Sequence, residues 1–355
     1  MAAAFSQNVL PNLVDWARSV DPDGAISDIA ELLSQCNEHV KDMIWKEGNL
    51  PLGHKVSVRA GLPQGTWRGI NQGVASTKAL QAQFQFSMGE LVDYSLVDKS
   101  EATLNGDVDA FRLSQDMAHI EGLSQQIASA EFYSNEATNP QQYTGLAPQY
   151  NTISTANAKN AVNCLSLGGS TSASQASMWL AGWGDETLFN IFPKGSPSGL
   201  QYEDKGDVRA LYDTNGNQFE GFTSYFCWKI GLVVKDWRYT VRMCNIDTTT
   251  NAGGLFSTTP PDLFAYMSRA VVRLPTLTRR ASGITETDSP REPAPGIRPA
   301  FYCNRTIRES LDIQAIRDKN VLLSSKDFAG DPVLAFRDIP IRVCDALTNS
   351  ESVLT

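Results

Sequence analysis

Two segments of the chain alternate apolar and polar side chains with the two-residue period of a β-strand. The segments flank residues 60–80, which have glycine at every fourth position from 61 to 73 and no helical apolar stripe. A structureless connection of more than about 15 residues is uncommon inside a compact domain. We therefore predict that residues 53–90 form a projecting hairpin arm. The alternating positions are His54, Val56 and Val58 before the connection and Ala82, Phe84, Phe86 and Met88 after it.

Two other segments carry apolar residues at the three- and four-residue spacing of amphipathic helices, in which an apolar stripe faces a core. The first covers residues 29–45 behind a cap at Ser27 and should end near Gly48. The second covers residues 107–133 and would be about 40 Å long at about 1.5 Å per residue. Its stripe consists of Leu113, Met117, Ile120, Leu123, Ile127 and Ala130.

In the second half of the chain, the sequence pattern predicts several strands and two shorter helices. One helix is expected at 262–274 after two prolines, and another opens at the T-x-x-E capping box of Thr306 and Glu309. Helices and strands alternate without a regular βα repeat, which predicts an α+β fold. The strands are predicted at residues 177–184, 186–192, 225–243, 300–304 and 338–347.

Two segments have the composition of loops. Residues 150–176 are rich in Asn, Ser, Thr, Ala and Gly, which marks a loop or a domain boundary. Residues 276–300 contain four prolines and few large apolar groups. A segment of that composition cannot bury enough surface to form a core, so we predict a surface loop or insertion there.

Composition and charge narrow the class of protein. Charged residues make up 19% of the chain, below the roughly 25% typical of soluble domains, which favours a surface that meets other protein. The net charge is −9 and no block of five like charges occurs, so gripping phosphate backbones is not the main activity. We expect any DNA nearby to be enclosed and not read in a sequence-specific way.

The cysteines and the N-terminus indicate a protein that stays in a reducing compartment. The six cysteines are at least 17 positions apart, so no CxxC pair exists, and reduced, buried thiols are expected. The first 20 residues have no basic region before an apolar stretch, and no window approaches 18 apolar residues. The chain is therefore expected to be neither exported nor membrane-bound.

The sequence lacks the common motifs of catalytic and cofactor-binding sites. GxGxxG, GxxxxGK[ST], GxSxG and SxxK do not occur. His119 and Glu121 form the H-x-E half of a zinc deaminase motif, but the P-C-x-x-C half is missing. We therefore predict no catalytic residue, no cofactor and no metal. Trp67 beside Arg68 could stack on bases, but its place at a loop tip favours a protein contact.

Seven long segments carry a family resemblance. They read LVDWARSVDPDGAISDIAELLSQCNE, IWKEGNLPLGHKVSVRAGLPQGTWRGINQGV, FYSNEATNPQQYTGLAP, WGDETLFNIFPKGSPSGLQYED, WKIGLVVKDWRYTVRMCNID, FYCNRTIRESLDIQ and FRDIPIRVCDALTNSE. In this order they resemble the major capsid proteins of epsilon 15-like tailed bacteriophages, a branch of the Hong Kong 97-type capsid fold. The segments cover most of the chain, and the Pro-rich residues 276–300 look like an insertion relative to the family.

The resemblance implies how the chain is divided into domains and arms. It implies an α+β Hong Kong 97-type fold in which the predicted arm is the extended loop and the helix from residue 107 is the spine. The implied parts are 1–52, N-terminal arm; 53–90, extended loop; 91–150 with 222–250 returning, peripheral domain; and 151–221 with 251–355, axial domain, in which 276–300 is a surface loop or insertion.

The resemblance also implies the function. The chain should be a major capsid protein that self-assembles as hexamers and pentamers into the icosahedral head shell around double-stranded DNA. The expected partners are further copies of the chain, a cement or decoration protein and the portal, with assembly in the host bacterial cytoplasm and location in the virion. A cellular compartment shell of the encapsulin type is the alternative, and an unrecognised enzyme is a third hypothesis. Distant relatives crosslink a lysine to an asparagine, but nothing in this sequence fixes such a pair.

The candidate functional residues are assembly contacts on the arm. A two-stranded hairpin is marginal alone in water, so its apolar face should need an external surface, which a neighbouring copy can supply. The alternative is that the hairpin packs on its own domain. The candidate contacts are Val56, Val58, Arg59, Trp67, Arg68, Phe84, Phe86 and Met88.

Overall fold

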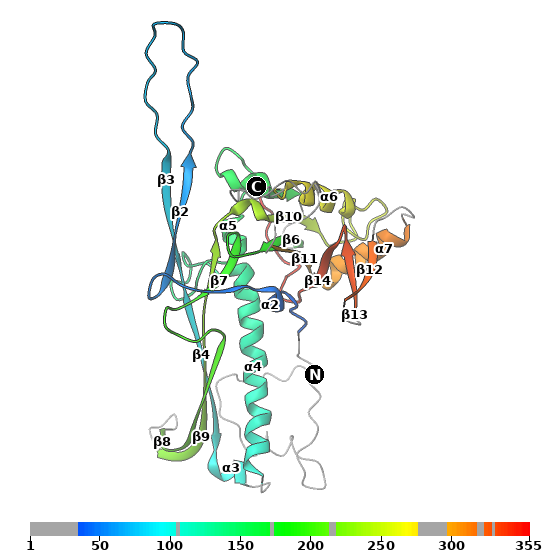
Figure 1. Ribbon diagram of the computed structural model, residues 1–355. Helices are drawn as coiled ribbons and strands as arrows, with labels where there is room; N and C mark the ends of the chain where they lie inside the picture. The colour runs from blue at the N-terminus through cyan, green and yellow to red at the C-terminus, as the bar shows by residue number, and fades with distance from the viewer. Residues whose placement is uncertain are drawn as a thin grey trace. The chain divides into compact units, whose positions relative to one another are not determined.

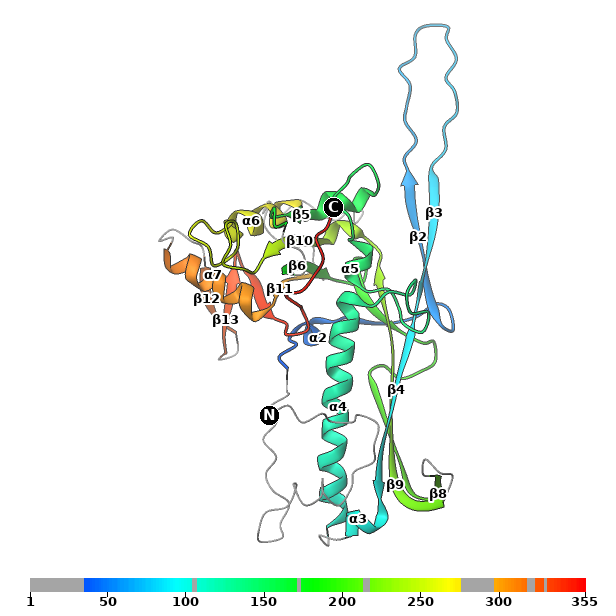
Figure 2. The same cartoon turned by 180° about the vertical axis from the view of Figure 1, so that it is seen from behind.

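The computed structural model, shown from two sides in Figures 1 and 2, describes residues 35–103, 107–170, 174–212, 218–275, 297–317, 323–328 and 331–355. The chain forms two compact units. Unit 1 consists of Met1–Gln35, Glu90–Ile127 and Pro197–Lys229, and unit 2 consists of Cys36–Gly89, Ala128–Ser196 and Ile230–Thr355. The part of the predicted 29–45 helix before residue 35 lies outside the described residues.

Unit 1 combines a long helix with antiparallel strands. Strands β8 and β9 form a hairpin with register from Leu200↔Trp228 to Tyr212↔Gln218, and β9 also neighbours β4. A small core of Val97, Ala102 and Phe111 joins strand β4 to helices α3 and α4. The helix predicted at 107–133 is confirmed as α4. The elements are β4 (Gly89–Asp98), α3 (Lys99–Thr103), α4 (Val108–Tyr133), β8 (Leu200–Tyr212) and β9 (Gln218–Val234), of which α4 and β9 continue into unit 2.

The apolar stripe predicted along α4 is only partly buried. Leu123 and Ile127 are buried, whereas Leu113 and Met117 are 62% and 60% exposed. In this half of the helix the buried face includes Asp116, whose carboxylate accepts hydrogen bonds from Ser224 Oγ at 2.8 Å and Tyr202 Oη at 3.4 Å. A buried carboxylate is tolerated when it is hydrogen-bonded, so α4 turns a partly polar face inward and leaves apolar side chains outside.

Unit 2 is organised around a mixed β-sheet. Its path runs β12-β13-β14-β11-β6-β7-β9, with β10 pairing with β5 and β6 and β1 pairing with β7. Strands β12 and β13 carry no apolar alternation strong enough to have been predicted. The strands not yet introduced are β1 (Trp45–Glu47), β5 (Cys164–Ser166), β6 (Gln175–Trp183), β7 (Leu188–Phe192), β10 (Thr240–Asp247), β11 (Arg298–Cys303), β12 (Leu323–Phe328), β13 (Asp331–Phe336) and β14 (Ile339–Val343).

Both faces of this sheet are covered. On one face, α6 (Leu263–Arg273) and α7 (Arg305–Arg317) pack against alternate residues of β6, among them Met178 and Leu180. On the other face, Trp179 contacts Phe132, near the end of α4, with ring centroids 6.1 Å apart. Because successive strand side chains point to opposite faces, every residue of β6 is buried. The short helices of unit 2 are α2 (His39–Asp42), α5 (Leu146–Gln149), η1 (Lys159–Asn163) and η2 (Trp237–Tyr239).

Four local predictions need correction. The strand predicted at 225–243 is broken, because β9 ends at Val234 and β10 begins at Thr240, with the short helix η2 between them. The helix predicted to end near Gly48 ends at Asp42, because Trp45–Glu47 pairs as a parallel strand with β7. Helix α7 is capped by Asn304, whose side-chain oxygen accepts a hydrogen bond from the Ile307 backbone N–H at 2.9 Å, and not by a Thr306 capping box. In the predicted loop 276–300, the last three residues belong to β11, and residues 276–296 lie outside the described part of the chain.

The turn between β13 and β14 is a site where the chain could be stabilised. Arg337 and Asp338 form a two-residue loop between the paired Phe336 and Ile339, and both have positive φ, 50° and 69°. Type I′ turns of this kind favour Asn-Gly because a Cβ at positive φ costs about 1 kcal/mol or more. Replacing Arg337-Asp338 by Asn-Gly should raise the free energy of unfolding by about 1 kcal/mol, measured by urea denaturation. A decrease in that free energy would show that side-chain contacts of this turn outweigh its backbone strain.

All six cysteines are free, and all except Cys36 are buried. Burial raises the pKa of the Cys303 and Cys344 thiols to about 12, so both stay protonated at neutral pH. They behave as small apolar groups of the core.

Candidate assembly site

The predicted arm is a two-stranded antiparallel hairpin of β2 (Gly53–Gly61) and β3 (Leu80–Ser87) that projects from the body of unit 2 (Figure 1). Its register places Val56 opposite Phe84 and His54 opposite Phe86, so these side chains share one face. Lysine, arginine and glutamine side chains occupy the other face. The hairpin predicted from the alternation is therefore confirmed, and the structure adds its register.

The base of the arm packs on its own unit. Val56, 4% exposed, contacts a cluster of Phe189, Ile191 and Val233 from strands β7 and β9. Partly buried side chains complete this cluster. They are Ile44, Val58, Phe86 and Met88.

Two glycines make the close packing at the base possible. A Cβ at Gly231 would lie 2.6 Å from the Ser87 carbonyl oxygen and 3.0 Å from Met88 Cγ, and a Cβ at Gly48 would lie 2.6 Å from Met88 Cε. The Asn49 side chain also pairs with the Lys55 backbone, donating to its carbonyl at 2.8 Å and accepting from its N–H at 2.7 Å. The base of the arm is thus fixed to the rest of unit 2.

The connection between β2 and β3 is exposed, and so is Phe84 of β3, which lies opposite the buried Val56. Trp67 is fully exposed and Ile70 is 94% exposed, while Phe84 is 53% exposed. Exposed large apolar side chains that cluster on one element mark interaction sites more often than isolated ones do. Burying Trp67, Ile70 or Phe84 against another surface would contribute about 2 kcal/mol each before ordering costs.

The structure thus divides the eight candidate contacts into two groups. Val56, Val58, Phe86 and Met88 already pack within unit 2, which corrects the expectation that the whole apolar face needs a neighbour. The alternative weighed from the sequence, packing on the same domain, holds for this base. The candidates whose side chains remain exposed are Arg59, Trp67, Arg68 and Phe84. Sequence reasoning missed Leu62, Ile70 and Val74, which lie in the glycine-rich connection and show no strand alternation.

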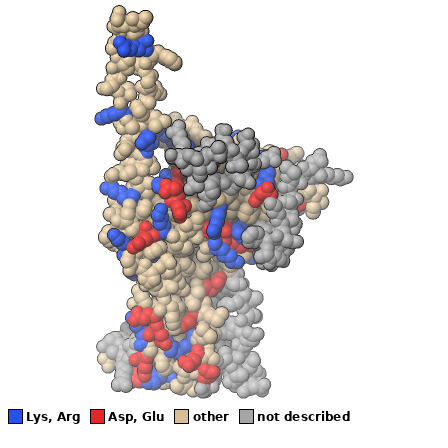
Figure 3. Space-filling model, viewed as in Figure 1, with Lys and Arg blue, Asp and Glu red and all other residues tan. Residues whose placement is uncertain are grey.

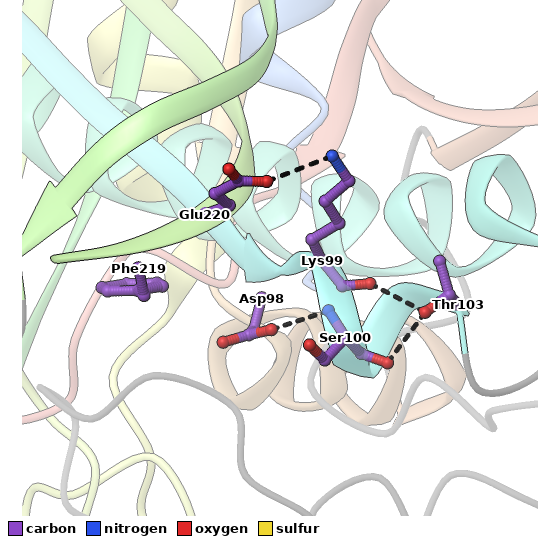
Figure 4. Close-up of a pocket in the computed structure, with 6 residues that line it drawn as sticks. All are labelled: Asp98, Lys99, Ser100, Thr103, Phe219 and Glu220. Atoms are coloured by element: carbon purple, nitrogen blue, oxygen red, sulfur yellow. Dashed lines mark hydrogen bonds and ion pairs between the residues drawn. The ribbon is translucent and has the colours of Figure 1, made fainter.

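A small open hollow in unit 1 offers no comparable chemistry. It is lined by Asp98, Lys99, Ser100, Thr103, Phe219 and Glu220 (Figure 4). Lys99 Nζ pairs with Glu220 at 3.3 Å and with Asp207 at 2.6 Å, and Asp98 accepts from the Ser100 backbone N–H at 2.7 Å. Its charged groups are therefore already paired. Within the described ranges, no three His, Cys, Asp or Glu side chains are grouped to hold a metal ion, and no helix could span a membrane.

The chain is similar to solved structures of bacteriophage particles and of an encapsulin. A solved structure of bacteriophage Epsilon15 is similar with a TM-score of 0.72 and 31% identity over 99% of each chain. The bacteriophage JBD30 capsid gives a TM-score of 0.44 at 9% identity over 96% of each chain. The SrpI encapsulin of Synechococcus elongatus gives 0.38 at 10% identity over 69% of this chain and 94% of that one. No curated protein sequence matches. The family described as major capsid protein GP7 matches residues 21–355.

The fold is that of a bacteriophage capsid subunit of the Hong Kong 97 type, because the similarity to Epsilon15 extends over the full length of both chains. The chain belongs to the major capsid protein GP7 family. It is a structural protein of a virion shell, and such a shell consists of many copies of its subunit. The match to this family and the likeness to Epsilon15 favour the viral function over the cellular compartment.

Proposed function

We propose that copies of this chain assemble as hexamers and pentamers into an icosahedral head shell that encloses double-stranded phage DNA without reading its sequence. The observation that supports this most directly is the likeness to Epsilon15 over 99% of both chains. Assembly takes place in the host bacterial cytoplasm, and the finished shell takes up a portal and a cement or decoration protein. The chain acts as a structural protein and carries no catalytic residue.

The division of the chain expected from the resemblance is part of the proposal. Residues 1–52 act as an N-terminal arm and 53–90 as the extended loop. Residues 91–150 and 222–250 form the peripheral domain, and the remaining residues form the axial domain. The long, regular α4 supports a spine role, since at about 1.5 Å per residue it is about 40 Å long.

The arm is the proposed contact between subunits. Its base is fixed to unit 2 by the Val56 cluster, while its outer part presents apolar side chains that nothing in the described chain covers. A second copy can cover them. The small free energy of each contact is multiplied over every subunit of the lattice.

Replacing Trp67, Ile70 and Phe84 by serine should leave a folded, soluble subunit that forms no shells, because only exposed side chains are changed. Electron microscopy and size-exclusion chromatography measure assembly, and thermal unfolding by circular dichroism measures folding. The matched control is Val272→Ser with Ile316→Ser, which removes apolar side chains 77% and 83% exposed on α6 and α7. The control should assemble. Normal shells from the arm variant would show that the arm is not the contact.

A further inference from the structure

A segment of unit 2 folds back on the end of helix α4. The segment consists of residues 134–145, and we call it the strap. The Ser134 N–H donates to the Ala130 carbonyl at 3.1 Å, and the Gly145 N–H donates to the Ser134 carbonyl at 2.8 Å. A Cβ at Gly145 would lie 2.6 Å from the Ala130 carbonyl oxygen, so the strap packs closely on the last turn of the helix. Between its two ends, residues 136–142 are exposed.

One buried side chain anchors the strap to both α4 and the arm. The Tyr143 hydroxyl donates a hydrogen bond to the Glu131 carboxyl of α4 at 3.0 Å. The ring of the same tyrosine lies beside the chain that leaves the arm, because a Cβ at Gly89 would be 3.4 Å from Tyr143 Cδ1. At the surface, Ser87 Oγ of β3 donates to the Glu136 carboxylate of the strap at 2.6 Å. The strap therefore connects the end of α4 to the base of the arm within unit 2.

The Glu131 carboxyl is buried without a cation. Burial raises its pKa to about 8, and no cation among the described residues opposes that rise. The groups that face it are the Tyr143 hydroxyl from the strap, which is titratable, and the uncharged Asn190 amide from β7. Residues 48–89 contain no acidic residue, and Figure 3 shows Lys and Arg but no Asp or Glu along the arm. The carboxyls that the strap links to the arm are therefore supplied by α4 and by the strap itself.

We infer that Glu131 is a proton-dependent latch: its neutral carboxyl keeps the strap closed on α4, and loss of the proton opens the strap and removes one support of the arm's base. A carboxylate in this position needs water, which can enter only if a neighbouring element moves. Strand β7 is held by β1 and β9, one on each side, and α4 by its helical hydrogen bonds. The strap is a largely exposed loop, so it is the element that opens at the lowest free energy.

The hydrogen bond from Tyr143 does not remove the need for water. A hydroxyl donates more strongly to a carboxylate than to a neutral carboxyl. One hydroxyl nevertheless replaces only a small part of the hydration of a carboxylate, which has about four acceptor positions. Glu131 Oε1 has no hydrogen-bond partner among the described residues, so ionisation leaves that oxygen without a donor.

The sign of the pH dependence follows from the two states of the strap. With the strap closed, Glu131 keeps its proton up to about pH 8, whereas in an open strap the pKa of the carboxyl returns to its ordinary value of 4.5. Between these values, opening releases one proton. Each pH unit in this range therefore raises the population of open straps about tenfold.

Hydrogen exchange of the full chain at pH 6 and pH 7, followed by mass spectrometry, measures this opening. After correction for the intrinsic effect of pH on exchange, residues 134–145 and 84–91 should exchange about tenfold faster at pH 7. Residues 175–183 of the central strand β6 should show no such local response. Glu131→Gln should abolish the tenfold difference, because glutamine keeps the shape of the side chain and carries no titratable proton. Glu136→Gln, which changes an exposed glutamate of the same strap, is the matched control and should keep it.

Three outcomes would overturn the inference. A tenfold difference that persists in Glu131→Gln means that another group releases the strap. A response of residues 134–145 without one of residues 84–91 means that the strap does not support the arm. An equal response of β6 means that unit 2 unfolds as a whole and contains no local latch. None of these measurements requires shells, so the inference and the proposed function can fail independently of each other.

Discussion

A chain with Glu351 replaced by alanine should have a free energy of unfolding lower by about 3 to 5 kcal/mol than that of the unchanged chain. Glu351 and Arg242 form an ion pair of 2.8 Å whose side chains are only 7% and 4% exposed. Removing the carboxylate leaves a guanidinium buried without its counter-charge, and an unpaired buried charge is among the costliest defects of a fold.

The surroundings of this pair explain why the loss should be large. The Glu351 carboxylate also accepts hydrogen bonds from Tyr133 Oη at 2.6 Å and from Ser177 Oγ. The Arg242 guanidinium donates to the Tyr150 carbonyl at 2.8 Å and lies 5.1 Å from the Trp179 ring centroid. One ion pair therefore joins the C-terminal segment to α4, β6 and β10 of unit 2.

Urea denaturation of Glu351→Ala, Arg242→Met and the double variant measures the coupling between the two side chains. The double variant should be more stable than the sum of the single losses predicts, because it leaves no isolated charge. Glu351→Gln is the conservative control, since it keeps the shape of the side chain. A loss below about 1 kcal/mol for Glu351→Ala would mean that water reaches the pair and that it behaves as a surface ion pair.

The second large effect concerns pH. The free energy of unfolding should be highest between about pH 4.5 and 6.5 and should fall on either side of that range. Glu131 is fully buried, and burial raises the pKa of its carboxyl to about 8. The Tyr143 hydroxyl donates a hydrogen bond to this carboxyl at 3.0 Å, and the Asn190 amide contacts it in a geometry that falls short of a regular hydrogen bond. These two contacts offset only part of the rise in the pKa. Burial also lowers the pKa of the His39 imidazole, packed between Phe132 and Tyr302, to about 3.

The two groups act in opposite directions. Above pH 4.5, unfolded chains release the Glu131 proton while folded chains keep it, so stability falls as pH rises towards about 8. Below pH 6.5, unfolded chains bind a proton on His39 while folded chains do not, so stability falls as pH decreases towards about 3. Between 4.5 and 6.5 the two slopes offset each other. For Glu131 the full change would be at most about 5 kcal/mol, since one pKa unit corresponds to about 1.4 kcal/mol.

Glu131→Gln should remove the loss of stability between pH 6.5 and 8 and leave the acid side unchanged, because glutamine keeps the shape and stays uncharged. His39→Phe should flatten the acid side. Denaturation series at several pH values measure both. An unchanged alkaline slope in Glu131→Gln would mean that this carboxyl is solvated and already ionised at neutral pH.

The amino-acid sequence by itself determines the arm and the long helix. The period-two alternation of Val56 and Phe84 with polar neighbours sets which side chains of each strand share a face, and the observed pairing of these two residues keeps the apolar side chains on one face. The helix predicted at 107–133 agrees with α4 because a long run of helical periodicity needs no distant partner to be recognised. The absence of acidic residues between Glu47 and Glu90 can also be read directly.

Only the tertiary structure decides which of these surfaces are covered. Trp45–Glu47 becomes a strand because β7 lies beside it, although Trp45 and its partner Asn190 are far apart in sequence. The apolar stripe of α4 is split because Asp116 finds hydrogen-bond donors in Ser224 and Tyr202. Val56 is buried and Phe84 is 53% exposed, although the two are paired on the same face of one hairpin, because Val56 packs on the cluster of Phe189 and Ile191 and Phe84 does not. Local periodicity encodes the face a side chain points to, but burial depends on contacts between residues distant in the chain.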